Sequence, residues 1–395
     1  MKFFKSLPAR LLLAIVIGIL AGLVLPRGAM VVVVTAKYIM GQIIMFCVPL
    51  IIIGFIAPSI TRLGSGATRM LTVAVILAYA SSVLAAFMSM CAGYAIIPHL
   101  NIITDPEGLR ELPSVAFQLD IPQIMPVMSA LVFSMLLGLA VVWTRSQVTF
   151  NLLQEFQSIV LEIVKKIIIP ILPFFIATTF CGLSWEGSIT HQLPIFLVVI
   201  LVVILGHFIW LAVLYGSASL YSGRSGREVI SHYGPAYLTA VGTMSSAATL
   251  GVALACARKS KNLRRDLVDF GIPLFANIHL CGSVLTEVFF VMTISKVLYG
   301  KIPPLSSMIL FCLLLGIFAI GAPGVPGGTV MASLGLITGV LGFDSDGTAL
   351  MLAIFALQDS FGTACNVTGD GALTLFLTGY ADKNGLKETK QVSVI

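Results

Sequence analysis

The sequence predicts an all-α membrane protein with about eight transmembrane helices and two re-entrant helical hairpins, arranged as inverted repeats. Three observations lead to this fold class: an apolar composition, apolar stretches of membrane-spanning length, and a one-sided distribution of positive charge. Of the 395 residues, 58% are hydrophobic and 10% are charged, and the mean hydropathy is +1.04. Soluble domains carry about 25% charged residues, and a soluble fold could not bury so much apolar surface.

Eight apolar stretches are each long enough to cross a bilayer. A hydrocarbon core of about 30 Å requires about 20 apolar helical residues. The first stretch follows basic residues, as in a signal peptide, but because more spans follow it we expect a retained helix. The predicted spans cover about residues 10–26, 30–61, 68–98, 123–144, 150–184, 192–221, 266–296 and 346–380.

Two further stretches, at about 231–256 and 305–342, have apolar flanks and a centre rich in Gly, Pro, Ser or Thr. Gly and Pro interrupt helices. Unpaired backbone at membrane depth is tolerated only where protein buries it or it lines a polar cavity. We therefore expect each stretch to be a helical hairpin that enters the membrane and returns to the same side. The alternative is that each is a single kinked crossing.

The placement of charge favours the hairpins. With both hairpins re-entrant and both termini inside, the basic residues gather on the cytoplasmic side, as the positive-inside rule expects. Making only the first hairpin a crossing would put the tail lysines outside, and making both crossings would put residues 258–265 outside. We therefore expect a multi-pass protein of the cell inner (plasma) membrane with cytoplasmic termini. The cytoplasmic set is Lys2, Lys5, Arg10, Arg62, Arg69, Arg145, Arg224, Arg227, Arg258, Lys259, Lys261, Arg264, Arg265, Lys383, Lys387 and Lys390.

Each hairpin is followed by a long helix with a polar break, NIHLCGS at 277–283 and DSFGTACNVTGDG at 359–371. The first hairpin opens from inside and the second from outside, which makes the two halves an inverted repeat. In transporters built this way, solute and ion sites form near the midplane at such breaks.

The last predicted helix carries a polar stripe. Asp359, Thr363, Asn366 and Asp370 are spaced 4, 3 and 4 residues apart, so they share one helix face. Together with Glu287, these carboxyl groups lie at membrane depth, where charged groups are costly and usually functional. Carboxylate, amide and hydroxyl oxygens suit hard cations and an ammonium group. The alternative is a structural hydrogen-bond network.

The tips of the two hairpins are also candidate binding elements. Thr243, Ser245, Ser246 and Thr249 cluster at the first tip, where hydroxyls and free N–H groups could bind a carboxylate; helix packing is the alternative. The second tip, GAPGVPGGT at 321–329, suits a gate that closes over a solute.

These features resemble the dicarboxylate/amino acid:cation symporter family, which includes glutamate/aspartate and serine/threonine transporters. The resemblance implies an elevator-type transporter fold and a homotrimer in membrane lipid. It also implies a small-molecule solute, Na⁺ and/or H⁺ as coupling ion, and no organic cofactor or nucleic-acid partner. Four ordered motifs carry it: TMSSAATL (243–250), PLFANIHLCGS (273–283), GAPGVPGG (321–328) and QDSFGTACNVTGD (358–370).

The resemblance divides the chain into domains. Residues 1–62 and 123–184 would form a scaffold and trimerisation domain, and residues 63–122 and 192–380 a moving transport domain. Residues 381–395 would be a cytoplasmic tail.

The resemblance also assigns roles to residues. Asp359 would hold the α-amino group of the substrate, Ser246 and nearby backbone its α-carboxylate, and Asn366 the substrate or the cation. The substrate-binding set is Thr243, Ser245, Ser246, Gly324, Val325, Gly327, Asp359, Gly362, Thr363 and Asn366. The cation-binding or proton-carrying set is Asn277, His279, Glu287, Asn366 and Asp370, with sodium at Asp370 and Asn366.

Two departures from the family pattern set the expected specificity. Gly362 replaces an arginine that pairs with acidic substrates, and an unpaired buried carboxylate costs several kcal/mol. We therefore expect a small neutral amino acid such as serine or threonine; a dicarboxylate or other organic acid is the alternative. Cys281 replaces a sodium-binding aspartate, so a proton carried by Glu287 or His279 is an alternative to sodium, and Glu287 could instead be structural.

An anion channel is the alternative from another functional class, because Gly-rich re-entrant loops occur in channels too. An intramembrane enzyme is a further alternative, but we expect no enzymatic activity because the sequence has no HExxH motif, no GxSxG motif and no convincing Ser/His pair.

Overall fold

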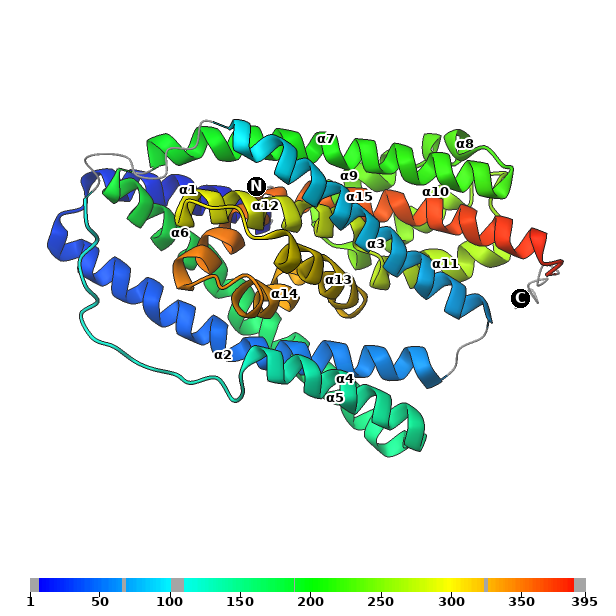
Figure 1. The fold of residues 1–395 in the computed structure, drawn as a ribbon, viewed down its shortest axis with the longest axis horizontal. Coiled ribbons are helices and arrows are strands. Elements are labelled where there is room, and N and C mark those ends of the chain that lie inside the picture. The colour runs from blue at the N-terminus through cyan, green and yellow to red at the C-terminus, as the bar shows by residue number, and fades with distance from the viewer. Residues whose placement is uncertain (1–6, 66–68, 101–109, 188, 323–325, 387–395) are drawn as a thin grey trace.

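The computed structural model describes residues 7–65, 69–100, 110–187, 189–322 and 326–386, and the regular elements in these ranges are all helices. The long helices α2 (Arg27–Ser65), α7 (Ile189–Ser222) and α15 (Ser345–Lys383) run along the length of the molecule (Figure 1). The all-helical class predicted from the sequence is confirmed.

The N-terminal part contains helices that pack mainly on one another. Helix α1 (Leu7–Val24) packs on α6 (Ile169–Glu186), and α2 packs on α4 (Val127–Thr144), α5 (Gln147–Ile163) and α6. The π-helical turn η3 (Val164–Ile168) joins α5 to α6. Pro170 follows this turn and lacks an N–H to continue the regular ladder, which explains a local change of helix type there.

The remaining helices surround α12 (Cys281–Tyr299) and α15, which lie at the centre. An 18-residue apolar stretch can be compared in three membrane-spanning segments. It is 89% buried in Arg265–Tyr299, which includes α12, and 89% buried in α15, against 33% in the segment Pro194–Ser222 of α7. Both centre helices contact α7, α3 (Arg69–Ile96) and each other. The other members of this group are η2 (Ile97–His99), α8 (Gly226–Ser231), α9 (Gly234–Thr243), α10 (Ser246–Ala257), α11 (Arg265–Ile278), α13 (Leu305–Gly321) and α14 (Gly328–Gly339).

Both stretches with polar centres fold as pairs of packed helices. Helices α9 and α10 contact each other across a turn at Met244, which adopts a left-handed φ of 53°. Ser245 then caps α10 by accepting a hydrogen bond from the N–H of Ala248. Helices α13 and α14 also contact each other, and α14 begins after Gly327, whose φ of 72° favours glycine.

By length and composition, five helical stretches in the described ranges can span a membrane. The eight predicted spans fall on α1, α2, α3, α4, α5–α6, α7, α11–α12 and α15. The five stretches of membrane-spanning length are Arg27–Pro58, Arg69–His99, Pro194–Ser222, Arg265–Tyr299 and Ser345–Lys383.

Candidate functional site

The polar stripe of α15 faces the interior of the helix bundle. Asp359 is 4% exposed, Thr363 5%, Asn366 1% and Asp370 1%. Polar groups cost free energy when buried without partners, so the neighbours of each one indicate what the stripe does.

The side chain of Asn366 caps the N-terminus of α12. Its side-chain oxygen accepts hydrogen bonds from the N–H groups of Gly282 (2.7 Å) and Ser283 (3.2 Å), and its Nδ2 donates to Ser283 Oγ (2.9 Å). Leu280 occupies the N-cap position of α12 and has no side-chain acceptor, so the first N–H groups of this helix need a cap from elsewhere.

Asp370 meets His279, which lies in the break between α11 and α12. The Asp370 Oδ1 and His279 Nδ1 atoms are 2.9 Å apart, and the His279 Nε2 atom lies 2.9 Å from Ser81 Oγ on α3. His279 is completely buried. The second carboxylate oxygen of Asp370, Oδ2, has no hydrogen-bond partner in the described part of the chain.

Asp359 meets the second hairpin tip. The N–H of Gly327 donates a 2.6 Å hydrogen bond to Asp359 Oδ2. The predicted tip residues Gly324 and Val325 lie outside the described residues.

The first hairpin tip is ordered by its own hydroxyl groups. Thr249 Oγ1 donates to the carbonyl of Ser245 (2.9 Å) and lies 3.1 Å from Thr243 Oγ1. Ser246 is 3% exposed. Helices α9 and α10 both contact α15, so the hairpin lies against the helix that carries the stripe.

Glu287 links α12 to the second hairpin. Its Oε1 accepts a hydrogen bond from Ser333 on α14. Its Oε2 atom is buried and has no partner among the described residues. The carboxyl group thus lies between a central helix and the element that carries the second tip.

The structure separates the Asn277 side chain from the cluster of Asn366, His279 and Asp370. Its side chain is exposed, and its Nδ2 donates a 2.7 Å hydrogen bond back to the carbonyl of Pro273. Of the residues proposed to hold the cation, Asn366, His279 and Asp370 therefore come together without it.

Gly362 packs closely on the start of α12. A Cβ atom at this position would lie 3.3 Å from both Cα and Oγ of Ser283. A larger side chain would require Ser283 to move by a few tenths of an ångström, so position 362 is tightly packed against α12. No Lys or Arg in the described ranges is buried.

Sequence reasoning missed several buried polar residues. Both amide atoms of Gln358, which precedes Asp359, are buried and have no partner in the ranges that the structure describes. His207 on α7 lies 3.0 Å from the carbonyl of Gly282 and 2.9 Å from Thr286 Oγ1. Polar side chains at membrane depth were a usable signal for both.

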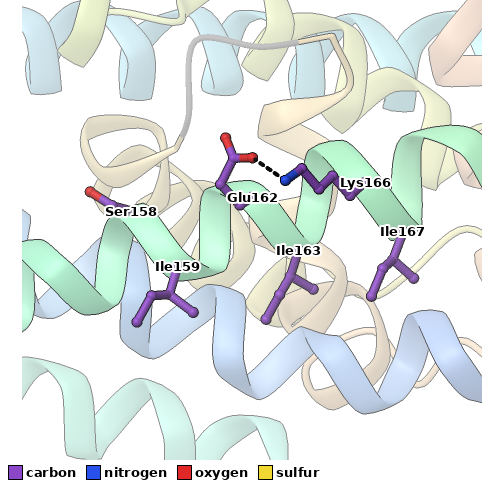
Figure 2. Close-up of a pocket in the computed structure, with 6 residues that line it drawn as sticks. All are labelled: Ser158, Ile159, Glu162, Ile163, Lys166 and Ile167. Atoms are coloured by element: carbon purple, nitrogen blue, oxygen red, sulfur yellow. Dashed lines mark ion pairs between the residues drawn. The ribbon is translucent and has the colours of Figure 1, made fainter.

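The surface hollow in Figure 2 is a different feature. Figure 2 shows Glu162 and Lys166, joined by a 3.4 Å ion pair, on one side of the helix and three isoleucines on the other. A hollow along one helix does not enclose a ligand as solute sites do. Its lining is Ser158, Ile159, Glu162, Ile163, Lys166 and Ile167.

Comparison with known proteins identifies the family. The model of the sodium:dicarboxylate symporter family matches residues 7–379. The chain belongs to this family. This match confirms the resemblance drawn from the four motifs. Members of the sodium:dicarboxylate symporter family are transporters.

The chain is also similar to excitatory amino acid transporters. It is 27% identical to excitatory amino acid transporter 2 of Mus musculus over 228 residues, 56% of this chain and 39% of that protein. It is 30% identical to excitatory amino acid transporter 3 of Mus musculus over 159 residues (40% and 29%), and 25% identical to that of Bos taurus over 280 residues (68% and 50%). The matched regions thus span about half or less of these curated relatives.

Proposed function

We propose that this chain is a cation-coupled symporter that imports a small neutral amino acid, such as serine or threonine. The observation that carries the proposal is the buried Asp359 carboxylate beside a glycine-rich tip, in an interior whose described residues include no Lys or Arg. A buried carboxylate without a basic partner is costly, and the α-ammonium group of an amino acid would compensate it.

A neutral side chain on the solute is supported by the surroundings of Asp359. Gly362 packs on Ser283 where a basic side chain would be needed to pair with an acidic substrate. The Gln358 amide on the same helix has no partner among the described residues, and we propose that it offers a donor and an acceptor to a hydroxyl or amide group of the solute. The family description names dicarboxylates, so a dicarboxylate or other organic acid is the competing substrate class.

The coupling ion is proposed to be Na⁺, H⁺ or both. Sodium is suggested by the family description. A proton is suggested by Glu287, because its buried Oε2, which has no partner in the described part of the chain, costs less when the carboxyl group is neutral.

The domain division is carried forward as part of the proposal. The contacts of α1, α2, α4, α5 and α6 among themselves support a scaffold, and the packing of both hairpins near α15 supports a separate moving domain. The homotrimer, the re-entrant entry of both hairpins and the cytoplasmic termini in the plasma membrane are proposed with it. The exposed apolar side chains of α4 and α5, including Leu136, Trp143, Leu152 and Ile159, offer surface to lipid or to another copy.

The test is uptake into proteoliposomes containing the purified full-length protein. Radiolabelled L-serine and L-aspartate are compared under an inward sodium gradient, an inward proton gradient and no gradient. We expect saturable serine uptake that requires a cation gradient and little aspartate uptake. Aspartate uptake that exceeds serine uptake would reject the neutral substrate, and current without saturable, gradient-driven uptake would reject the symporter.

A further inference from the structure

We propose that His279 takes the place of a coupling ion beside Asp370, so that this carboxylate does not bind sodium in this chain. The inference deepens the proposed function, on which it rests for treating Asp370 as a candidate ion ligand. It concerns ion binding and can be measured without any solute.

The imidazole is held from both sides. Its Nδ1 atom lies 2.9 Å from Asp370 Oδ1 on α15, and its Nε2 atom lies 2.9 Å from Ser81 Oγ on α3. His279 is 0% exposed, and Asp370 is 1% exposed. Both ring nitrogens therefore have partners, and the ring cannot turn away from the carboxylate without leaving buried polar atoms unpaired.

The space around the imidazole is filled. A Cβ atom on Gly369 would lie 2.9 Å from Cε1 of His279 and 3.4 Å from Sγ of Cys281. The ring of Phe275 lies edge-on to the imidazole with a centroid separation of 6.4 Å. Any side chain at position 369 would clash with the imidazole, which indicates that the His279 ring is tightly packed against α15.

All but one of the side-chain oxygen atoms that a sodium ion would use here already have hydrogen-bond partners. Hard cations require several oxygen ligands. Asp370 Oδ1 is paired with His279, and the Asn366 oxygen accepts two backbone N–H groups of α12. Cys281 supplies a sulfur atom, and the Asn277 side chain bonds to its own helix. Oδ2 of Asp370 is the one side-chain oxygen of this set without a partner.

An imidazole N–H donated to Asp370 also does what a bound cation does for a buried carboxylate. It compensates the cost of removing that carboxylate from water. A sodium ion in the position of this N–H would have to displace the hydrogen bond to Oδ1 and leave Nδ1 of the imidazole without a partner. The geometry thus favours a permanently occupied position over an exchangeable ion site.

The test measures thermal unfolding of the purified full-length protein in detergent, in NaCl and in choline chloride at equal ionic strength. A ligand that binds the folded state raises the unfolding temperature. The unfolding temperature in NaCl minus that in choline chloride should be the same for the wild type and for the single variant Asp370→Asn. The double variant His279→Asn/Cys281→Asp should gain a sodium-specific increase that grows with sodium concentration, and adding Asp370→Asn should abolish that gain.

Two results would overturn the proposal. One is a wild-type sodium response that disappears in Asp370→Asn, because sodium would then bind at this carboxylate. The other is a folded, monodisperse double variant with no added sodium response. If the double variant does not fold, the comparison of wild type with Asp370→Asn decides alone. Failure of serine uptake would reject the proposed function and would leave these salt responses unaffected.

Discussion

The backbone N–H of Gly327 donates a 2.6 Å hydrogen bond to the Asp359 carboxylate, and so joins the second hairpin to the last helix. The left-handed conformation of Gly327, with φ 72°, places this N–H at the start of α14. The carboxylate proposed to hold the solute ammonium group therefore also holds the tip. We expect solute binding and tip position to be energetically coupled.

The first prediction concerns Asp359 itself. Replacing Asp359 with alanine removes the partner of the ammonium group and the acceptor for Gly327. Uptake of serine should fall by about 100-fold or more, a loss of at least about 2.7 kcal/mol in binding or transport free energy. Proteoliposome uptake and the serine-induced thermal shift measure this loss. The neighbouring Ser360→Ala is the matched control, and equal effects of the two substitutions would contradict the assignment.

The second prediction concerns Gln358. Replacing it with methionine, an apolar side chain of the same length, removes two buried polar atoms that have no partner among the described residues. The folded protein should become more stable by about 1–3 kcal/mol, while serine uptake should fall at least tenfold. Stability is measured by thermal unfolding in detergent. Loss of stability together with loss of uptake would indicate a structural amide, and unchanged uptake would exclude contact with the solute.

The third prediction concerns Asn366 as the cap of α12. Asn366→Ala leaves the N–H groups of Gly282 and Ser283 without an acceptor, and should destabilise the protein by about 2–4 kcal/mol. Asn366→Asp keeps an oxygen acceptor and should cost less. Thermal unfolding of the two variants checks the order. A reversed order would show that the side-chain amide donor matters more than the cap.

The fourth prediction compares two adjacent serines on α3. Ser81 contacts His279, whereas Ser82 Oγ is buried without a partner among the described residues. Ser81→Ala should destabilise the protein by about 1–3 kcal/mol, because it leaves the imidazole Nε2 unpaired. Ser82→Ala should be neutral or slightly stabilising. Equal unfolding temperatures for the two variants would mean that the Ser81–His279 contact contributes little.

The fifth prediction concerns pH and Glu228 on α8, outside the candidate spans. Burial raises the pKa of Glu228, but hydrogen bonds from neighbouring groups outweigh it and lower the pKa below its ordinary value. The donors are Ser260 Oγ (2.5 Å), Lys261 N (3.2 Å), Asn262 Nδ2 (3.0 Å) and His232 Nε2 (3.1 Å).

A carboxyl group with a lowered folded-state pKa stabilises the protein above its unfolded-state pKa, near 4.3 for Glu. That contribution is lost as the pH falls through the folded-state pKa. Wild type should therefore unfold at a higher temperature than Glu228→Gln at pH 7, and the gap should narrow below about pH 4.3. A gap that stays constant from pH 7 into this acidic range would contradict the pKa assignment.

Local features of the site could be predicted from the sequence. The 4, 3 and 4 spacing of Asp359, Thr363, Asn366 and Asp370 specifies one helix face whatever that face contacts. The helix interruptions were predictable for the same reason, because Gly and Pro act on the backbone within a turn.

The partners of these residues could not be predicted. Ser81 and His279 are 198 positions apart, and Ser333 and Glu287 are 46 apart, so no local rule relates them. One signal was available at α12, whose N-cap position is Leu280. A helix that begins with an apolar residue needs an acceptor from another element, and Asn366 supplies it. The pairing of Asn366 with backbone was therefore open to prediction, but the helix that would provide it was not.

The way α12 begins has a mechanical consequence. Four hydrogen bonds connect the break between α11 and α12, at residues 279–283, to Asn366 and Asp370 on α15. These bonds leave the break little freedom to bend. Among the described residues, the hydrogen bond from Gly327 to Asp359 connects the start of α14 to the same helix. Bending at 279–283 would break several buried hydrogen bonds at once, so we expect α11, α12 and α15 to move as one unit.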